Sequence, residues 1–158
     1  MQNAKISVAT DDALADEEKA AFKNVIRACA CGNLRRATRV VTRQFDEVFR
    51  ALGLRSTQVV ILMHVGEQGT AILSALARKL AMDASTLTRN LNPLEEAGLI
   101  VAEKTPAGRR RSVKLTDAGI AMLRRALPLW QKAQASVTAS FDGAEWERLR
   151  GTLDRLAG

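Results

Sequence analysis

The order of short elements in residues 73–115 constrains the fold of this chain more than any other feature. Apolar residues at helical spacing over 73–80 predict a short helix, and Asp83 is placed to cap a second helix over 84–97. Gly98 ends the second helix. Two strand-like runs, 99–104 and 109–115, then flank the turn residues 105–108.

Two helices in tight succession followed by a hairpin are the order of a winged helix-turn-helix. In the second helix Leu87, Leu91 and Leu94 share one face, which predicts burial against the preceding helices. The opposite face is short and polar, and it carries Ser85, Thr88, Arg89 and Asn92. Such a face suits the major groove of DNA, where Arg reads guanine and Asn reads adenine. A merely solvated helix face is the alternative, and such a face is usually richer in Glu and Lys.

Positive charge gathers at the tip of the predicted hairpin, in Arg109, Arg110 and Arg111. The whole chain has 24 Lys and Arg against 17 Asp and Glu, a net charge of +7 in 158 residues. Basic side chains gathered in this way indicate a polyanionic partner, double-stranded DNA first. A solvated loop and a charge that serves only solubility are the alternatives.

The remaining chain is predicted to be helical, so the fold class is mainly α with a small β-hairpin wing. A helical pattern begins near Asp16, and Gly32-Asn33 is expected to interrupt it. Further helices are expected over 33–52, over 56–67 with Ser56 or Thr57 as the cap, over 117–140 with a kink at Pro128, and beyond 143. Pro93 is expected either to bend or to end the helix over 84–97. Residues 1–16 are expected to form a loose arm.

The chain lacks the groups that most enzymes need, so we expect no catalytic activity, no cofactor and no metal. Its one histidine, His64, sits in an apolar run and is placed like a core or interface residue. Nucleotide-binding and zinc-protease motifs are absent. Neither a membrane-spanning run nor a secretory signal is recognised, which favours a cytoplasmic protein with no membrane partner.

The residues from Asp83 through Gly98-Leu99-Ile100, the arginine-rich tip, and the run Val113-Lys-Leu-Thr-Asp-Ala-Gly119 resemble the winged-helix core of the MarR family. These are bacterial and archaeal transcription regulators. The segments from Asn33 to Phe45-Asp-Glu and from Gly53 to Gln58 also resemble the family, so the resemblance covers roughly residues 25–157. One departure is Ala107, which occupies a slot where the family commonly has an acidic residue that helps to fix the wing arginine.

The resemblance implies a homodimer that binds a pseudo-palindromic DNA site and represses transcription. It implies a dimerisation region in 17–55 and 117–158 and a DNA-binding domain in 56–116. The DNA-contacting residues would be Ser85, Thr86, Thr88, Arg89 and Asn92 with Arg109, Arg110 and Arg111, and the dimer contacts would include Trp146, Leu149, Leu153 and Leu156. A winged-helix module that binds another protein is the alternative function.

The resemblance also implies a signal that releases the DNA. Family members often bind small aromatic or anionic effectors between the two regions, and the candidates here are Arg39, Arg43, His64 and Trp130. Cys29 and Cys31 are candidates for an oxidant signal, although a structural role and metal binding are open alternatives. Two thiols do not complete a zinc site of four ligands by themselves, and a small thiol- or metal-dependent enzyme is the third hypothesis.

Overall fold

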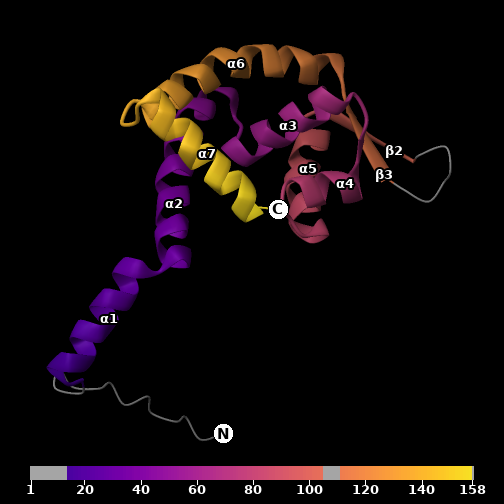
Figure 1. Ribbon diagram of the computed structural model, residues 1–158. Helices are drawn as coiled ribbons and strands as arrows, with labels where there is room; N and C mark the ends of the chain where they lie inside the picture. Colours follow the sequence, from indigo (N-terminus) through magenta and orange to yellow (C-terminus); the bar gives the residue numbers. More distant parts are fainter. Residues whose placement is uncertain (1–13, 105–110, 158) are drawn as a thin grey trace, which may run out of the picture. The chain divides into compact units, whose positions relative to one another are not determined.

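The computed structural model describes residues 14–104 and 111–157 (Figure 1). Contacts divide the chain into two compact units, Met1–Val40 and Val41–Gly158. This division falls inside a helix.

The first unit contains α1 (Asp16–Ala28) and the beginning of α2 (Ala30–Phe49). The expected interruption at Gly32-Asn33 is wrong, because the helix breaks at Cys29 and both residues lie inside α2. Side-chain bonds explain the shift. The Asn33 amide donates to the carbonyl oxygens of Arg27, at 3.0 Å, and Cys29, at 2.9 Å, while the Gly32 N–H donates to the Cys29 Sγ at 3.3 Å. These bonds satisfy backbone groups that a helix break leaves without partners.

The second unit begins in α2, which runs into a 3₁₀ turn (Arg50–Leu52) and ends at Gly53. Gly53 has a φ of 69°, the left-handed conformation that favours glycine at a helix end. The next helix, α3 (Ser56–Gln68), is not capped by Ser56 or Thr57 as expected. Instead Arg55 is the N-cap residue, and its N–H donates to the Gln58 Oε1 at 2.9 Å.

The core of the second unit forms around α3, which the apolar run predicted to be central. Val59, Ile61, Leu62 and Val65 of this helix are fully buried. Around it lie α4 (Leu73–Lys79), α5 (Ala84–Glu96) and α6 (Asp117–Thr138), and α7 (Gly143–Ala157) follows α6 in the chain (Figure 1). The fold is therefore mainly helical, as predicted.

A small antiparallel sheet joins the helices, with the strand order β1-β3-β2. The strands β2 (Ile100–Lys104) and β3 (Arg111–Leu115) are the predicted hairpin, and Ala102 pairs with Val113 at its centre. The third strand, β1 (Ala71–Ile72), was not predicted. Two residues are too few to show an alternating pattern, so only pairing with β3 reveals this strand.

The start of α6 is tied to the turn that follows α5. Thr116 donates through its hydroxyl to the Gly98 carbonyl at 2.6 Å and through its N–H to the Leu99 carbonyl at 3.1 Å. Gly119 is buried in the same joint, where a Cβ atom would collide with the backbone carbonyl of Leu99. Glycine is therefore required here for close approach of two backbones.

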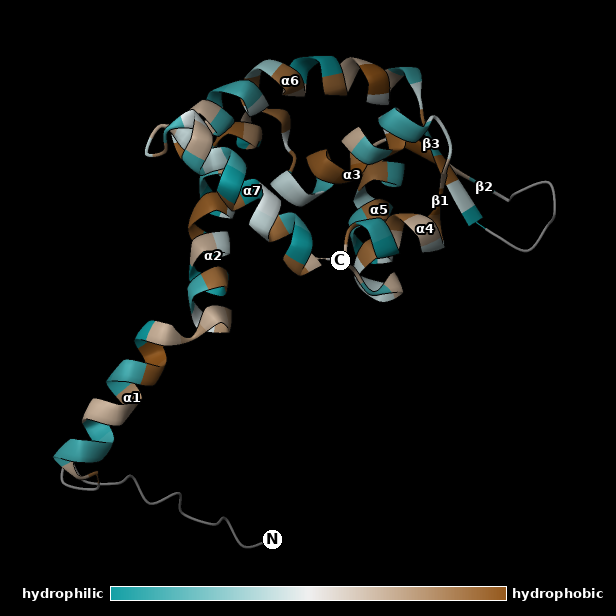
Figure 2. Cartoon of the chain, in the orientation of Figure 1, coloured by the Kyte–Doolittle hydropathy of each residue, from teal (hydrophilic) through white to brown (hydrophobic). Residues whose placement is uncertain are grey.

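Large apolar side chains remain exposed on several helices, among them α1, α2, α6 and α7. Along α1 and α7, brown apolar and teal polar residues are interspersed (Figure 2). In the described ranges no single helix is both long enough and apolar enough to cross a membrane. The segments Ala30–Leu52 and Ser56–Gln68 together would be long and apolar enough to cross a membrane, by length and composition only. The two segments are bent by 76° relative to each other at the break between them.

Candidate nucleic-acid interface

The predicted helix-turn-helix consists of α4, a four-residue connection and α5. Ala81 in the connection has a positive φ of 49°, which few non-glycine residues adopt. The Met82 N–H donates to the Ala77 carbonyl at 2.9 Å, so the chain turns back tightly onto α4. Asp83 then ends the connection and begins α5.

Asp83 is the N-cap of α5, as predicted. Its Oδ1 accepts the Thr86 N–H at 2.7 Å and the Ser85 hydroxyl at 2.6 Å, and its Oδ2 accepts the Thr86 hydroxyl at 2.8 Å. The hydrogen bonds from Ser85, followed by those from Thr86, hold the pKa of the Asp83 carboxyl well below its usual range. Asp83 is therefore ionised at neutral pH.

The two predicted faces of α5 are confirmed by burial. Leu87, Leu91 and Leu94 are 1%, 4% and 0% exposed. The residues on the other face are solvent-accessible: Ser85, Thr88, Arg89 and Asn92 are exposed and Thr86 is half-buried. The helix continues through Pro93 to Glu96, so termination at this proline is wrong.

The hairpin brings one predicted residue beside α5. Arg111 is exposed at the first position of β3, opposite Lys104. Together with Thr88 it lines a hollow of about 280 Å³, whose other lining residues are Ile72, Leu73, Ser74, Ala84 and Leu87. The structure thus places two of the predicted DNA-contacting residues around one concave surface. Arg109 and Arg110 lie outside the described residues.

Ser74 is a member of this surface that the sequence analysis missed. It is exposed in the first turn of α4 and lines the hollow with Thr88 and Arg111. Its only local signal is its position at the start of a short helix, and such a position is not specific. The juxtaposition depends on how α4, α5 and β3 pack together.

The basic side chains of this region differ in how they are neutralised. Lys79 pairs with Glu67 at 2.8 Å, and Lys114 pairs with Glu103 at 2.8 Å. Arg89 and Arg111 form no ion pair within residues 14–104 and 111–157. Their charges are therefore available to a polyanion.

The effector candidates of the second unit lie in different places. Trp130 lines a cavity of about 330 Å³ between α2, α3, the end of α4 and α6. Arg43 lines a separate hollow of about 300 Å³ together with Lys132. The His64 Nδ1 lies 3.4 Å from the Glu67 Oε2, and Lys79 followed by His64 lowers the pKa of Glu67. In the first unit, Arg39 is exposed on α2.

The cavity beside Trp130 is mainly apolar. Val41, Phe45, Phe49, Val59, Val60, Leu80 and Met82 supply apolar walls, and Thr42, Ser56 and Thr57 supply hydroxyl groups. This lining has the chemistry of a small-molecule pocket, with apolar walls and few polar groups.

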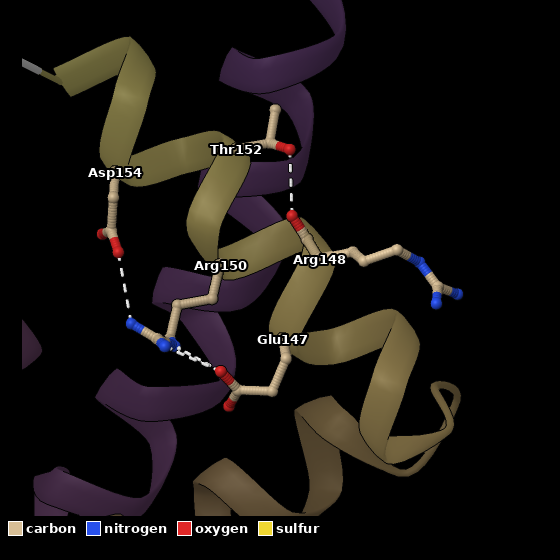
Figure 3. A network of polar contacts seen from close by, with 5 residues as sticks. All are labelled: Glu147, Arg148, Arg150, Thr152 and Asp154. Atoms are coloured by element: carbon tan, nitrogen blue, oxygen red, sulfur yellow. Dashed lines mark hydrogen bonds and ion pairs between the residues drawn. The ribbon is translucent and has the colours of Figure 1, made fainter.

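The predicted dimer contacts on α7 lie on a partly exposed face. Trp146 is half-buried and packs against Phe141 with ring centroids 5.9 Å apart. Leu149, Leu153 and Leu156 are 36%, 38% and 68% exposed. Another side of the helix is polar: Arg150 binds Glu147 at 2.7 Å and Asp154 at 3.2 Å, whereas the Arg148 side chain extends away from this network (Figure 3).

The two cysteines belong to the first unit and carry free thiols. Cys29 is half-buried at the helix break, and Cys31 is exposed in the first turn of α2. Among the described residues, no three His, Cys, Asp or Glu side chains are grouped so as to hold a metal ion.

Comparison with known proteins agrees with this geometry. The MarR family model matches residues 54–112. The HTH-type transcriptional regulator PecS of Dickeya dadantii is 30% identical over 131 residues, which cover 79% of this chain and 78% of PecS.

Solved structures extend the likeness to proteins that hold DNA. The M. tuberculosis transcriptional regulator MosR in complex with DNA is 35% identical, with a TM-score of 0.75 over 82% of this chain and 93% of that chain. A mutant E. coli MarR complexed with operator DNA shares the fold, with 22% identity and a TM-score of 0.75 over 84% of this chain and 96% of that chain. The chain belongs to the MarR family of DNA-binding transcriptional regulators and is not an enzyme.

Proposed function

We propose that this regulator binds a pseudo-palindromic DNA site as a homodimer, with α5 of each subunit in the major groove. One observation carries the proposal: α5 buries its three leucines and leaves a short polar face in solvent, beside the exposed Arg111. The crystal structure of MosR in complex with DNA, at 35% identity, supports DNA as the partner.

The chemistry of the exposed face assigns roles to its side chains. Arg89 and Asn92 have the donor and acceptor groups for bidentate contacts to guanine and adenine. Ser85, Thr86 and Thr88 lie beside them and contact the adjoining base edges. Arg111, with Arg109 and Arg110, contacts phosphates or a narrow minor groove. The two helices of a dimer then enter major grooves about one helical turn apart.

The apolar face of α7 supports the second copy. Leu149, Leu153 and Leu156 are partly exposed on one side of this helix, and such a patch marks an interaction site. A two-fold dimer covers the same patch on both subunits and presents two equivalent recognition helices. This symmetry is the reason to expect a pseudo-palindromic site.

Selection from a random-sequence duplex pool, followed by fluorescence anisotropy on the recovered sequence, tests the proposal. Arg89→Ala is expected to weaken binding to the selected duplex by at least about 30-fold, because the dimer loses one bidentate base contact of about 1–3 kcal/mol in each half-site. Arg148→Ala is the matched control, because it removes one exposed arginine from α7 and should leave the affinity unchanged. Recovery of no common sequence would instead favour the module that binds another protein.

Repression follows from steric exclusion. A dimer that spans two grooves at a promoter occupies the surface that RNA polymerase needs. In vitro transcription from a template with the selected sequence across the promoter is expected to fall as the protein is added. A rise in transcript would indicate activation.

The cavity beside Trp130 is the proposed effector site. Its aromatic and aliphatic walls and its few hydroxyl groups suit one substituted aromatic ring. Benzoate, 4-hydroxybenzoate and phenol are suitable probes, and binding measured by calorimetry should be lost in Trp130→Ala. Equal binding by this variant would place the ligand elsewhere. Release by oxidation of Cys29 and Cys31 stays a prediction that peroxide treatment of a double Cys→Ala variant tests.

A further inference from the structure

At the start of α5, the hydroxyl groups of Ser85 and Thr86 already donate their protons to hydrogen bonds within the protein. Ser85 lies 2.6 Å from the Asp83 Oδ1, and the Thr86 hydroxyl lies 2.8 Å from the Asp83 Oδ2. An ionised carboxylate only accepts hydrogen bonds, so each hydroxyl must be the donor. The Thr86 N–H also donates to the Oδ1, at 2.7 Å. Thr86 therefore binds both carboxylate oxygens and fixes the orientation in which Asp83 holds Ser85.

This arrangement changes what Ser85 offers to a ligand. A free serine hydroxyl has one proton and two lone pairs, so it donates or accepts as the partner requires. With its proton given to Asp83, the exposed Ser85 hydroxyl offers lone pairs alone. It is an acceptor, and it contacts a hydrogen-bond donor without breaking the bond to the carboxylate.

The major groove presents donors and acceptors in a fixed pattern. Adenine and cytosine display an amino group, which donates, while guanine and thymine display carbonyl oxygens, which accept. We propose that Asp83 is a positioning residue for sequence recognition: it turns Ser85 into an acceptor, which selects adenine or cytosine over guanine or thymine on the contacted strand. The inference rests on the proposed DNA binding by α5 and adds a rule for one base position.

Thr88 provides an internal comparison. Its hydroxyl donates to the Ala84 carbonyl at 2.8 Å, so its proton is also committed, but to the helix backbone. Its preference should likewise be for an amino base and should not depend on Asp83.

Three substitutions distinguish the effect of the hydrogen bond between Ser85 and Asp83 from the effect of the negative charge of Asp83. Asp83→Gly removes both acceptors, and glycine is tolerated as an N-cap with little loss of stability. Asp83→Asn removes the charge but keeps one oxygen, which the Thr86 N–H holds in the Oδ1 position, so Ser85 stays bound. Asp142→Gly is the matched control, because Asp142 is the acidic N-cap of α7 and accepts the Glu145 N–H at 2.7 Å.

The experiment is parallel selection from a random-sequence duplex pool with the full-length wild type and each variant. Ser85→Ala identifies the base position that Ser85 reads, and Thr88→Ala identifies that of Thr88. At the Ser85 position the wild type should prefer adenine or cytosine by about fivefold, the factor for one net hydrogen bond. The preference should vanish in Asp83→Gly and persist in Asp83→Asn and Asp142→Gly. The preference at the Thr88 position should persist in Asp83→Gly.

A second measurement leaves the protein fold unaltered. In the selected duplex, the adenine or cytosine at the Ser85 position is replaced by purine or pyrimidin-2-one, which lacks only the amino group. The wild type should lose about fivefold in affinity and Ser85→Ala should lose nothing. A preference for guanine or thymine at this position, an unchanged preference in Asp83→Gly, or no effect of Ser85→Ala overturns the inference while the selected sequence still supports DNA binding. Failure of the wild type to select any sequence overturns both proposals.

Discussion

Replacement of Gly119 by alanine tests the joint between α6 and the turn after α5. Gly119 is buried, and the new Cβ would collide with the Leu99 carbonyl. Because that carbonyl belongs to the backbone and accepts the Thr116 N–H at 3.1 Å, it does not rotate away as a side chain would. Overpacking of this kind typically destabilises by about 1–3 kcal/mol.

The helix propensity of alanine offsets part of this loss, by up to about 1 kcal/mol. The net expectation is a decrease of about 1–2 kcal/mol in the free energy of unfolding, which lowers Tm by about 2–8 °C in a chain of this size. Thermal and urea unfolding followed by circular dichroism measure both quantities. Gly143→Ala is the matched control, since a Cβ there meets no atom within 4 Å and the variant should be as stable as the wild type or slightly more stable. Stability equal to the wild type in Gly119→Ala would refute the close approach of the two backbones.

Three further predictions concern the dimer, the wing and pH. Leu153→Glu, on the exposed apolar face of α7, should shift the protein from dimer to monomer in sedimentation velocity, whereas Ala144→Glu in the first turn of α7 should not; a persistent dimer would place the interface elsewhere. Arg111→Ala removes one phosphate contact from each subunit of the dimer, so it should reduce the slope of log affinity against log salt concentration by about two; the same slope as the wild type would argue against a phosphate contact. The hydrogen bonds that lower the pKa of Asp83 in the folded state stabilise the fold above the ordinary aspartate pKa of about 3.9, and this stabilisation is lost as the pH falls below it. The free energy of unfolding of Asp83→Ala should therefore fall less steeply with decreasing pH than that of the wild type. The same acid dependence in both proteins would contradict the role given to the hydrogen bonds of Asp83.

Much of the candidate site could be predicted from the sequence because its signals are local. The spacing of Leu87, Leu91 and Leu94 predicts a buried face, and the polar residues between them must then face solvent. Asp83 precedes its helix by one residue, so its role as the N-cap needs no information from elsewhere in the chain. The turn residues 105–108 between the two strand-like runs predict the hairpin.

The predictions from sequence were wrong or incomplete where side chains form hydrogen bonds across a helix break, or where one element forms only by pairing with another. The interruption predicted at Gly32-Asn33 moves to Cys29 because the Asn33 amide bonds backwards to two carbonyl groups. The strand β1 exists only through its pairing with β3.

The sequence alone determined which residues of the second unit are helical and which face of α5 is polar, because periodicity and capping operate within a few residues. Tertiary structure decided that Ser74, Thr88 and Arg111 line one hollow and that Trp130 borders an apolar cavity. These groupings join residues that are distant in the chain, and their positions follow from how α3, α4, α6 and the sheet pack around a shared core.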